Sequence, residues 1–117
     1  EAALYDFVIS EADAILADLP SDVNTKSRAS KGAVLAMKAR AALYAGSIAR
    51  YGASTPQVSL PGGEVGIPAS RAEEYYTTAL SAAQSIINGE VGNYSLYEKK
   101  PDLSENFASI FYDKSNL

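Results

Sequence analysis

The chain has 117 residues, 47% of them hydrophobic, which is enough apolar material for one packed domain, and its net charge of −4 argues against a nucleic-acid partner. It contains no cysteine and no histidine, which excludes disulfides, thiolate or imidazole metal sites, cysteine nucleophiles and serine–histidine triads. We therefore expect a helical module that is not an enzyme and that uses neither a metal nor another cofactor.

The first expected helix runs from Ala2 to Leu19. Apolar residues recur there every three or four positions, and Pro20 then ends the pattern. The expected core stripe consists of Leu4, Phe7, Val8, Ala12, Ile15, Leu16 and Leu19.

The second expected helix runs from Lys31 to Arg50, with Ser30 as its N-cap. It holds seven alanines between Ala33 and Ala49, whose small side chains let neighbouring helices approach closely. The pattern therefore predicts a central helix with neighbours on several sides.

A third helix is expected after a capping box formed by Ser70 and Glu73, and Gly89 is placed to end it in the left-handed conformation. Its expected core stripe is Tyr76, Ala79, Leu80, Ala83, Ile86 and Ile87. A second capping box, from Asp102 to Glu105, predicts a short helix that continues to Phe111. Residues 94–97 alternate in polarity, so they are compatible with an extended segment.

Residues 51–69 form the longest expected loop, because they contain three prolines and four glycines. A helix-to-helix connection of this length is functional or disordered more often than neutral. Within it, the glycine-rich stretch 62–66 lacks the lysine and hydroxyl residue of a phosphate-binding loop. The adjacent Glu73 and Glu74 point in different directions on a helix, so they do not form a facing catalytic pair.

Charge is segregated along the chain. The six charged residues before residue 26 are acidic, and the six from residue 26 to residue 50 are basic. On the expected first helix Glu11 and Asp18 flank the apolar stripe, whereas Asp6 and Asp13 lie on its far side. We expect Glu11 or Asp18 to pair with Lys38 or Arg40 across two antiparallel helices, in preference to a basic patch for an acidic partner.

The eight tyrosines are the polar-aromatic residues most suited to ligand contact. Tyr44 and Tyr76 lie on helical stripes, and we expect them to pack with their hydroxyls at the edge of the core. Tyr51, Tyr94 and Tyr97 lie at segment ends or in loops, so they are the candidate ligand or partner contacts.

The stretch from Ser30 through Lys38-Ala39-Arg40-Ala41-Ala42-Leu43-Tyr44-Ala45-Gly46 resembles the alanine-rich helix of the SusD/RagB family. The later motifs follow in that family's order: Tyr76-x-x-Ala79 through Ile86-Ile87, a glycine, Tyr94-Ser95-Leu96, and Asn106-Phe107 to Phe111. The second and third helices also resemble one tetratricopeptide pair, although the loop between them is far longer than a tetratricopeptide turn.

The resemblance implies an all-α fold of antiparallel, tetratricopeptide-like helix pairs, in which residues 1–117 form a single helical region of a larger domain. It also implies a cell-surface outer-membrane lipoprotein that binds glycans or other nutrients and delivers them to a SusC-like TonB-dependent transporter. In that family the sugar contacts lie largely outside these helices. A fragment of this kind leaves Leu4, Phe7, Phe107 and Phe111 partly exposed.

The alternative is an independent helical adaptor that holds a peptide or protein partner in a groove. It predicts an exposed apolar concave face, larger than a monomer tolerates. A small carboxylate-dependent hydrolase is disfavoured, because no pair of carboxylates has suitable spacing.

Overall fold

The computed structural model describes residues 1–21, 28–58, 60–62 and 64–113, and these residues are helical wherever they are regular. The helices are α1 (Ala2–Leu16), α2 (Lys31–Tyr51), α3 (Ala72–Ile87) and α4 (Leu103–Tyr112). Three short 3-10 turns are added at Gly52–Ser54, Pro56–Val58 and Ala69–Arg71. No strand occurs within the described ranges, so the expected all-α fold class is confirmed.

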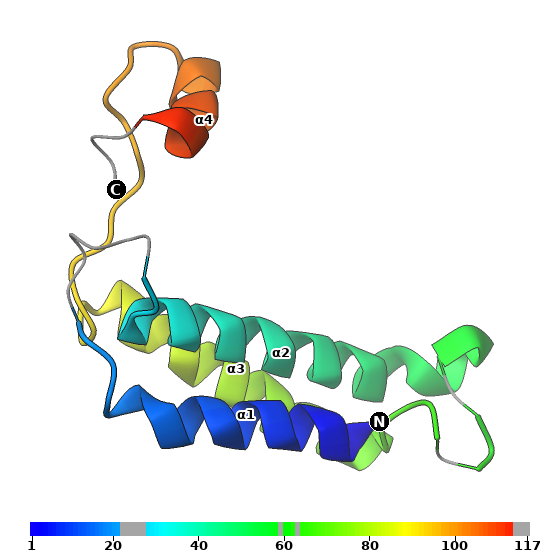
Figure 1. Cartoon of the computed structure of the whole chain (residues 1–117). Helices are drawn as coiled ribbons and strands as arrows, with labels where there is room; N and C mark the ends of the chain where they lie inside the picture. The colour runs from blue at the N-terminus through cyan, green and yellow to red at the C-terminus, as the bar shows by residue number, and fades with distance from the viewer. Residues whose placement is uncertain (22–27, 59, 63, 114–117) are drawn as a thin grey trace.

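The first three helices lie side by side, and α4 lies apart from them (Figure 1). The chain reverses between α1 and α2 and again between α2 and α3, so α2 is antiparallel to both neighbours. An extended arm, residues 93–102, then carries α4 beyond the end of α3. The radius of gyration is therefore 17.2 Å, compared with about 13 Å for a compact domain of this length.

Helix α1 buries a face that only partly matches the expected one. The expected members Leu4, Phe7 and Ile15 are 65%, 59% and 44% exposed. The residues that pack on α2 and α3 are Ala2, Tyr5, Ile9, Ala12 and Leu16. Ala12 and Leu16 were expected, and the packed set as a whole is centred about 80° further round the helix than the expected one. The helix also ends at Leu16 and does not reach Leu19. Leu19 precedes Pro20, and a residue in that position disfavours helical dihedrals.

Helix α2 is the central helix, as predicted. The Ser30 hydroxyl accepts a hydrogen bond from the backbone N–H of Ala33, which makes Ser30 the N-cap. Ala42, Ala45 and Ala49 are completely buried or nearly so. Because these contacts involve methyl groups, α1 and α3 approach the α2 backbone closely while each buried residue removes little apolar surface from water.

Helix α3 begins differently from the prediction. Ser70 lies inside the 3-10 turn before the helix, where it does not have the extended backbone that an N-cap needs. The N-cap is Arg71, which makes no side-chain capping bond, so the predicted capping box is wrong. The other end is as predicted: Gly89 has φ of +76°, its N–H donates to the Ile86 carbonyl, and the next N–H donates to Ser85, as in a Schellman motif.

The buried stripe of α3 is also shifted by one position from the expected one. Tyr75 is 1% exposed and is the largest fully buried side chain among the described residues, whereas the expected core residues Leu80 and Ile87 are 58% and 81% exposed. The buried residues are Ala72, Tyr75, Ala79 and Ala82, of which Ala79 was expected, and the expected Tyr76 and Ile86 pack against the edge of the core. Small side chains thus occupy most of the α2/α3 contact, and larger apolar ones remain outside.

The loop and the arm are largely irregular, as predicted. The described part of the loop contains two of the 3-10 turns and returns to α1, where the Gly66 N–H donates to the Glu1 carboxylate at 2.7 Å. Ile67 then enters the core. Residues 94–97 form no strand, since bridging in the described chain is limited to the isolated pair Glu90 and Gly92.

Helix α4 starts as predicted, with the Asp102 carboxylate accepting from the Ser104 N–H at 2.7 Å. Its apolar side is exposed, including Phe107 at 68% and Phe111 at 75%, whose rings contact each other edge to face. With Leu4 and Phe7 of α1, these are the four residues that the sequence predicted to be partly exposed.

Candidate functional site

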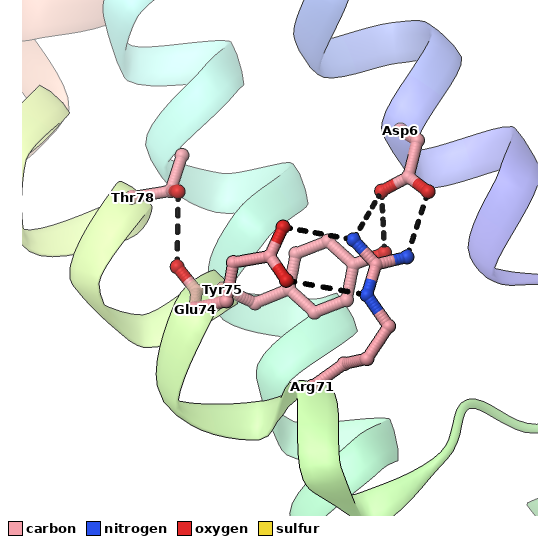
Figure 2. A network of polar contacts seen from close by, with 5 residues as sticks. All are labelled: Asp6, Arg71, Glu74, Tyr75 and Thr78. Carbon is pink, nitrogen blue, oxygen red and sulfur yellow. Dashed lines mark hydrogen bonds and ion pairs between the residues drawn. The ribbon is translucent and has the colours of Figure 1, made fainter.

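The densest polar network in the described chain joins the start of α1 to the start of α3 (Figure 2). Asp6 comes from the second turn of α1, and Arg71 ends the 3-10 turn that leads into α3. Glu74 and Tyr75 come from the first turn of α3. The chain enters α3 through Pro68, and the 3-10 turn that follows presents Arg71 to α1.

Arg71 is the centre of this network. Its two terminal nitrogens donate to the two carboxylate oxygens of Asp6 at 2.7 and 3.0 Å, a bidentate arrangement. The same guanidinium donates to Glu74 at 2.9 and 3.3 Å. It also lies over the Tyr75 ring, 4.6 Å from the ring centre, and the Tyr75 hydroxyl donates to Asp6 at 2.6 Å.

These contacts shift the pKa values of Asp6 and Tyr75 in opposite directions. Hydrogen bonds from Arg71 and then from Tyr75 lower the pKa of Asp6. Burial and the hydrogen bond to Asp6 raise the pKa of Tyr75 to about 12, and bonding to Asp6 and Glu74 raises the pKa of Arg71. At neutral pH, Asp6 is ionised and Tyr75 is protonated, so neither is set to exchange a proton with a substrate. The network is a clamp between helices.

A second ion pair joins α1 to α2, between Asp13 and Lys38. The predicted cross-helix pairing therefore exists, and Lys38 was predicted correctly, but the acid comes from the other side of α1. Asp6 and Asp13 form the ion pairs, while Glu11 and Asp18 are exposed. The cause is the rotation of α1, which brings the side with Asp6 and Asp13 toward its neighbours.

The sequence does not predict the clamp, because each part has another interpretation. The periodicity places Asp6 on the far side of α1, and it favours Tyr44 and Tyr76, not Tyr75, for the edge of the core. Two signals were present: Arg71 and Glu74 are three positions apart, and Asp6 and Asp13 are separated by two helical turns. The pairing of residues 65 positions apart has no local signature.

The three candidate tyrosines do not form one site. Tyr51 is 59% exposed at the end of α2, and Tyr94 is 43% exposed beside Gly32 at the beginning of α2. The helix between Gly32 and Tyr51 separates them by about 28 Å. Tyr97 donates a hydrogen bond to Asp113 after α4, and Lys99 lies 5.3 Å from its ring centre. Tyr94 and Tyr97 therefore share the arm, while Tyr51 lies at the opposite end of the three-helix unit.

Tyr44 and Tyr76 were both expected at the edge of the core, and only Tyr76 lies there. Tyr76 is half-buried, and its hydroxyl reaches Ser47 at 3.4 Å. Tyr44 is 53% exposed, so it is not a core residue, and Arg40 lies 5.7 Å from its ring centre.

An apolar groove of about 390 Å³ lies between α2 and α3. Its lining is Ala39, Arg40, Leu43, Tyr76, Ala79, Leu80 and Ala83. A more polar hollow of about 400 Å³ lies near the end of α1, where Asp13, Lys31 and Glu90 contribute charged groups. The groove can accommodate an apolar side chain or the apolar side of a helix. The adaptor alternative predicts an exposed apolar surface of this kind.

Among the described residues, no group of three or more carboxylates is arranged to hold a metal ion. Over the same part of the chain, no helix combines the length and hydropathy that crossing a membrane requires. Comparison of the chain with family models, with curated proteins and with solved structures finds no match in any of the three.

Proposed function

We propose that this chain is the helical scaffold of a SusD-like outer-membrane lipoprotein, which binds a glycan or another nutrient and delivers it to a SusC-like TonB-dependent transporter. The scaffold acts by binding and docking, without a catalytic step. Tyr51, Tyr94 and Tyr97 remain the candidate ligand or partner contacts on its surface.

One contact supports this proposal most directly. Gly46 ends the alanine-rich motif of α2, and Tyr76 begins the Tyr-x-x-Ala motif of α3, and these are the two longest stretches that resemble the family. The Tyr76 ring lies so close to α2 that a Cβ atom on Gly46 would be 2.9 Å from its Cδ1 atom. A glycine opposite an aromatic ring explains why both residue types occur in these positions.

The chemistry of the described residues fits a scaffold. Asp6, Arg71 and Tyr75 bond to one another, so their polar groups join α1 to the start of α3. The alanine contacts of α2 then fix the spacing of the three helices. The exposed tyrosines are available for contact with the planar faces of sugar rings.

The test has two parts, because the proposal has two partners. The protein is tagged in its native cells and purified from detergent-solubilised outer membranes, and we expect a TonB-dependent transporter to copurify with it. The purified protein is also screened against a glycan panel by calorimetry. Absence of the protein from the outer membrane, or copurification of no transporter together with no glycan binding, would contradict the proposal.

A helical adaptor is the second candidate, and the α2/α3 groove is the observation that favours it. The groove is lined by apolar groups and has one cationic residue, Arg40. An amphipathic helix places its apolar side in such a groove. Binding of an amphipathic peptide that is lost in Leu80→Glu, with no glycan binding, would favour the adaptor over the scaffold of a nutrient-binding protein.

A further inference from the structure

The α2/α3 groove is exposed along a side that α1 does not cover. All of its lining residues belong to α2 and α3, and the two largest aliphatic ones, Leu43 and Leu80, are 50% and 58% exposed. Large apolar side chains in one groove cost free energy as long as water surrounds them. The groove therefore has the properties of a docking surface.

Helix α4 carries a matching surface on the same chain. Leu103, Phe107 and Phe111 are 83%, 68% and 75% exposed, and with Ile110 they lie within an arc of about 100°. The buried residues of α4 are polar, namely Asn106 and Ser109. The helix thus turns its polar side inward and its aromatic side to solvent, the reverse of an ordinary surface helix.

Specific bonds to the arm maintain this reversed orientation. The Asn106 side chain accepts from the Lys100 N–H and donates to the Lys100 carbonyl, both at 2.8 Å. Asp113, just after α4, accepts from the Tyr97 hydroxyl. The arm and α4 therefore form one unit that leaves the aromatic face exposed to solvent, and this unit lies apart from the three-helix unit (Figure 1).

We propose that the α2/α3 groove binds the aromatic face of α4 from a second copy of this chain. The sizes agree, because the ten residues of α4 extend over about 15 Å and the groove spans Tyr76 to Ala83 on α3, about 10 Å. Both surfaces are largely apolar: Arg40 is the one charged residue that lines the groove, and Glu105 lies on the opposite side of α4 from the aromatic face.

A second copy fits better than the chain's own α4. Helix α4 lies apart from the three-helix unit and contributes no residue to the groove of its own chain, and the bonds at Lys100 tie the helix to the arm. Exchange between two copies is reciprocal, so each copy provides one α4 and one groove. Three aromatic or aliphatic residues from each surface, counted twice by symmetry, bury on the order of 1,500 Å², the size of a standard interface.

Sedimentation of the full chain over a wide range of concentrations tests the contact. We expect a dimer for the wild type, and a dissociation constant at least about tenfold higher for Leu80→Glu and for Phe107→Glu, since a charge is then placed in an apolar contact. Ser81→Glu is the matched control. It adds the same charge to α3, but Ser81 is exposed and lies outside the groove. Leu43→Ser and Phe111→Ser provide a second pair, and circular dichroism reports whether each variant keeps its helix content.

Mixing the two kinds of variant makes the test specific. Leu80→Glu retains a normal α4, and Phe107→Glu retains a normal groove, so their mixture contains one complete contact and we expect it to form heterodimers. A wild type that stays monomeric at every concentration would overturn the proposal, whether α4 is free or folds onto its own groove. Dimers that persist in both single variants, or a mixture that stays monomeric, would also overturn it.

Discussion

Arg71 holds Asp6 through two hydrogen bonds of 2.7 and 3.0 Å, and this contact joins α1 to the start of α3 across 65 positions of sequence. It matters because α1 buries mainly small or half-exposed residues, with Ala12 alone fully buried. Packing of a small residue defines the rotation of a helix weakly, whereas a bidentate ion pair has a defined direction. The clamp therefore specifies which side of α1 faces the other helices.

The first prediction concerns the strength of this clamp. Asp6→Asn removes the negative charge that Arg71 and Tyr75 share, and we expect the free energy of unfolding to fall by about 1 kcal/mol, because the groups are partly exposed to solvent. Asp13→Asn is the matched control: Asp13 accepts one bond, from Lys38, whereas Asp6 accepts three, so its loss costs less, ~0.5 kcal/mol. Urea unfolding measures both, and an equal loss in the two variants would contradict a special role for Asp6.

The second prediction is the pH dependence of the same contact. Bonding lowers the pKa of Asp6 in the folded state below its ordinary value of 3.8. Its contribution to stability is therefore present above pH 3.8 and is lost as the pH falls through the lower, folded-state value. We expect the stability difference between wild type and Asp6→Asn to shrink as the pH falls from 7 toward about 3. A difference that stays constant over this range would show that the charge of Asp6 does not stabilise the fold.

The third prediction compares two glycines near the end of α2. An alanine at position 46 brings its Cβ to 2.9 Å from the Tyr76 ring, so the ring must move, and we expect a net loss of about 1 kcal/mol. At Gly52 the backbone is right-handed, with φ of −58°, and an added Cβ meets no atom within 4 Å. Gly52→Ala then stabilises by about 0.5 kcal/mol, since it restricts the unfolded chain. Thermal unfolding distinguishes the two, and a gain in both variants would show that α2 and α3 tolerate wider spacing.

The starts and ends of the helices were predictable from the sequence where the capping signals are local. Ser30 capped α2, Asp102 capped α4 and Gly89 ended α3, because each of these functions depends on residues within a few positions. The capping box at Ser70 failed for one local and one nonlocal reason. A 3-10 turn after Pro68 places Ser70 one residue before the N-cap, and the N-cap residue Arg71 is bonded to Asp6 on another helix.

The buried faces were less predictable, because two stripes on α1 have the same period. The expected stripe includes the larger residues Leu4 and Phe7, yet Ala2, Tyr5 and Ile9 face the core in their place, while Ala12 and Leu16 belong to both stripes. Periodicity alone does not choose between them. The choice depends on Asp6 and its partner on another helix, and that pairing is visible only in three dimensions.

The fourth prediction concerns the link between the arm and α4. Asn106→Ala leaves the Lys100 N–H and carbonyl without their partner, so we expect hydrogen exchange at the Lys100 amide to become at least about tenfold faster. The stability of the α1–α3 unit should not change, because α4 lies apart from it. Glu105→Gln is the control on the exposed side of the same helix, with no change expected at Lys100. If the Lys100 amide exchanged at the wild-type rate in Asn106→Ala, the orientation of α4 would depend on other contacts, such as the one between Tyr97 and Asp113.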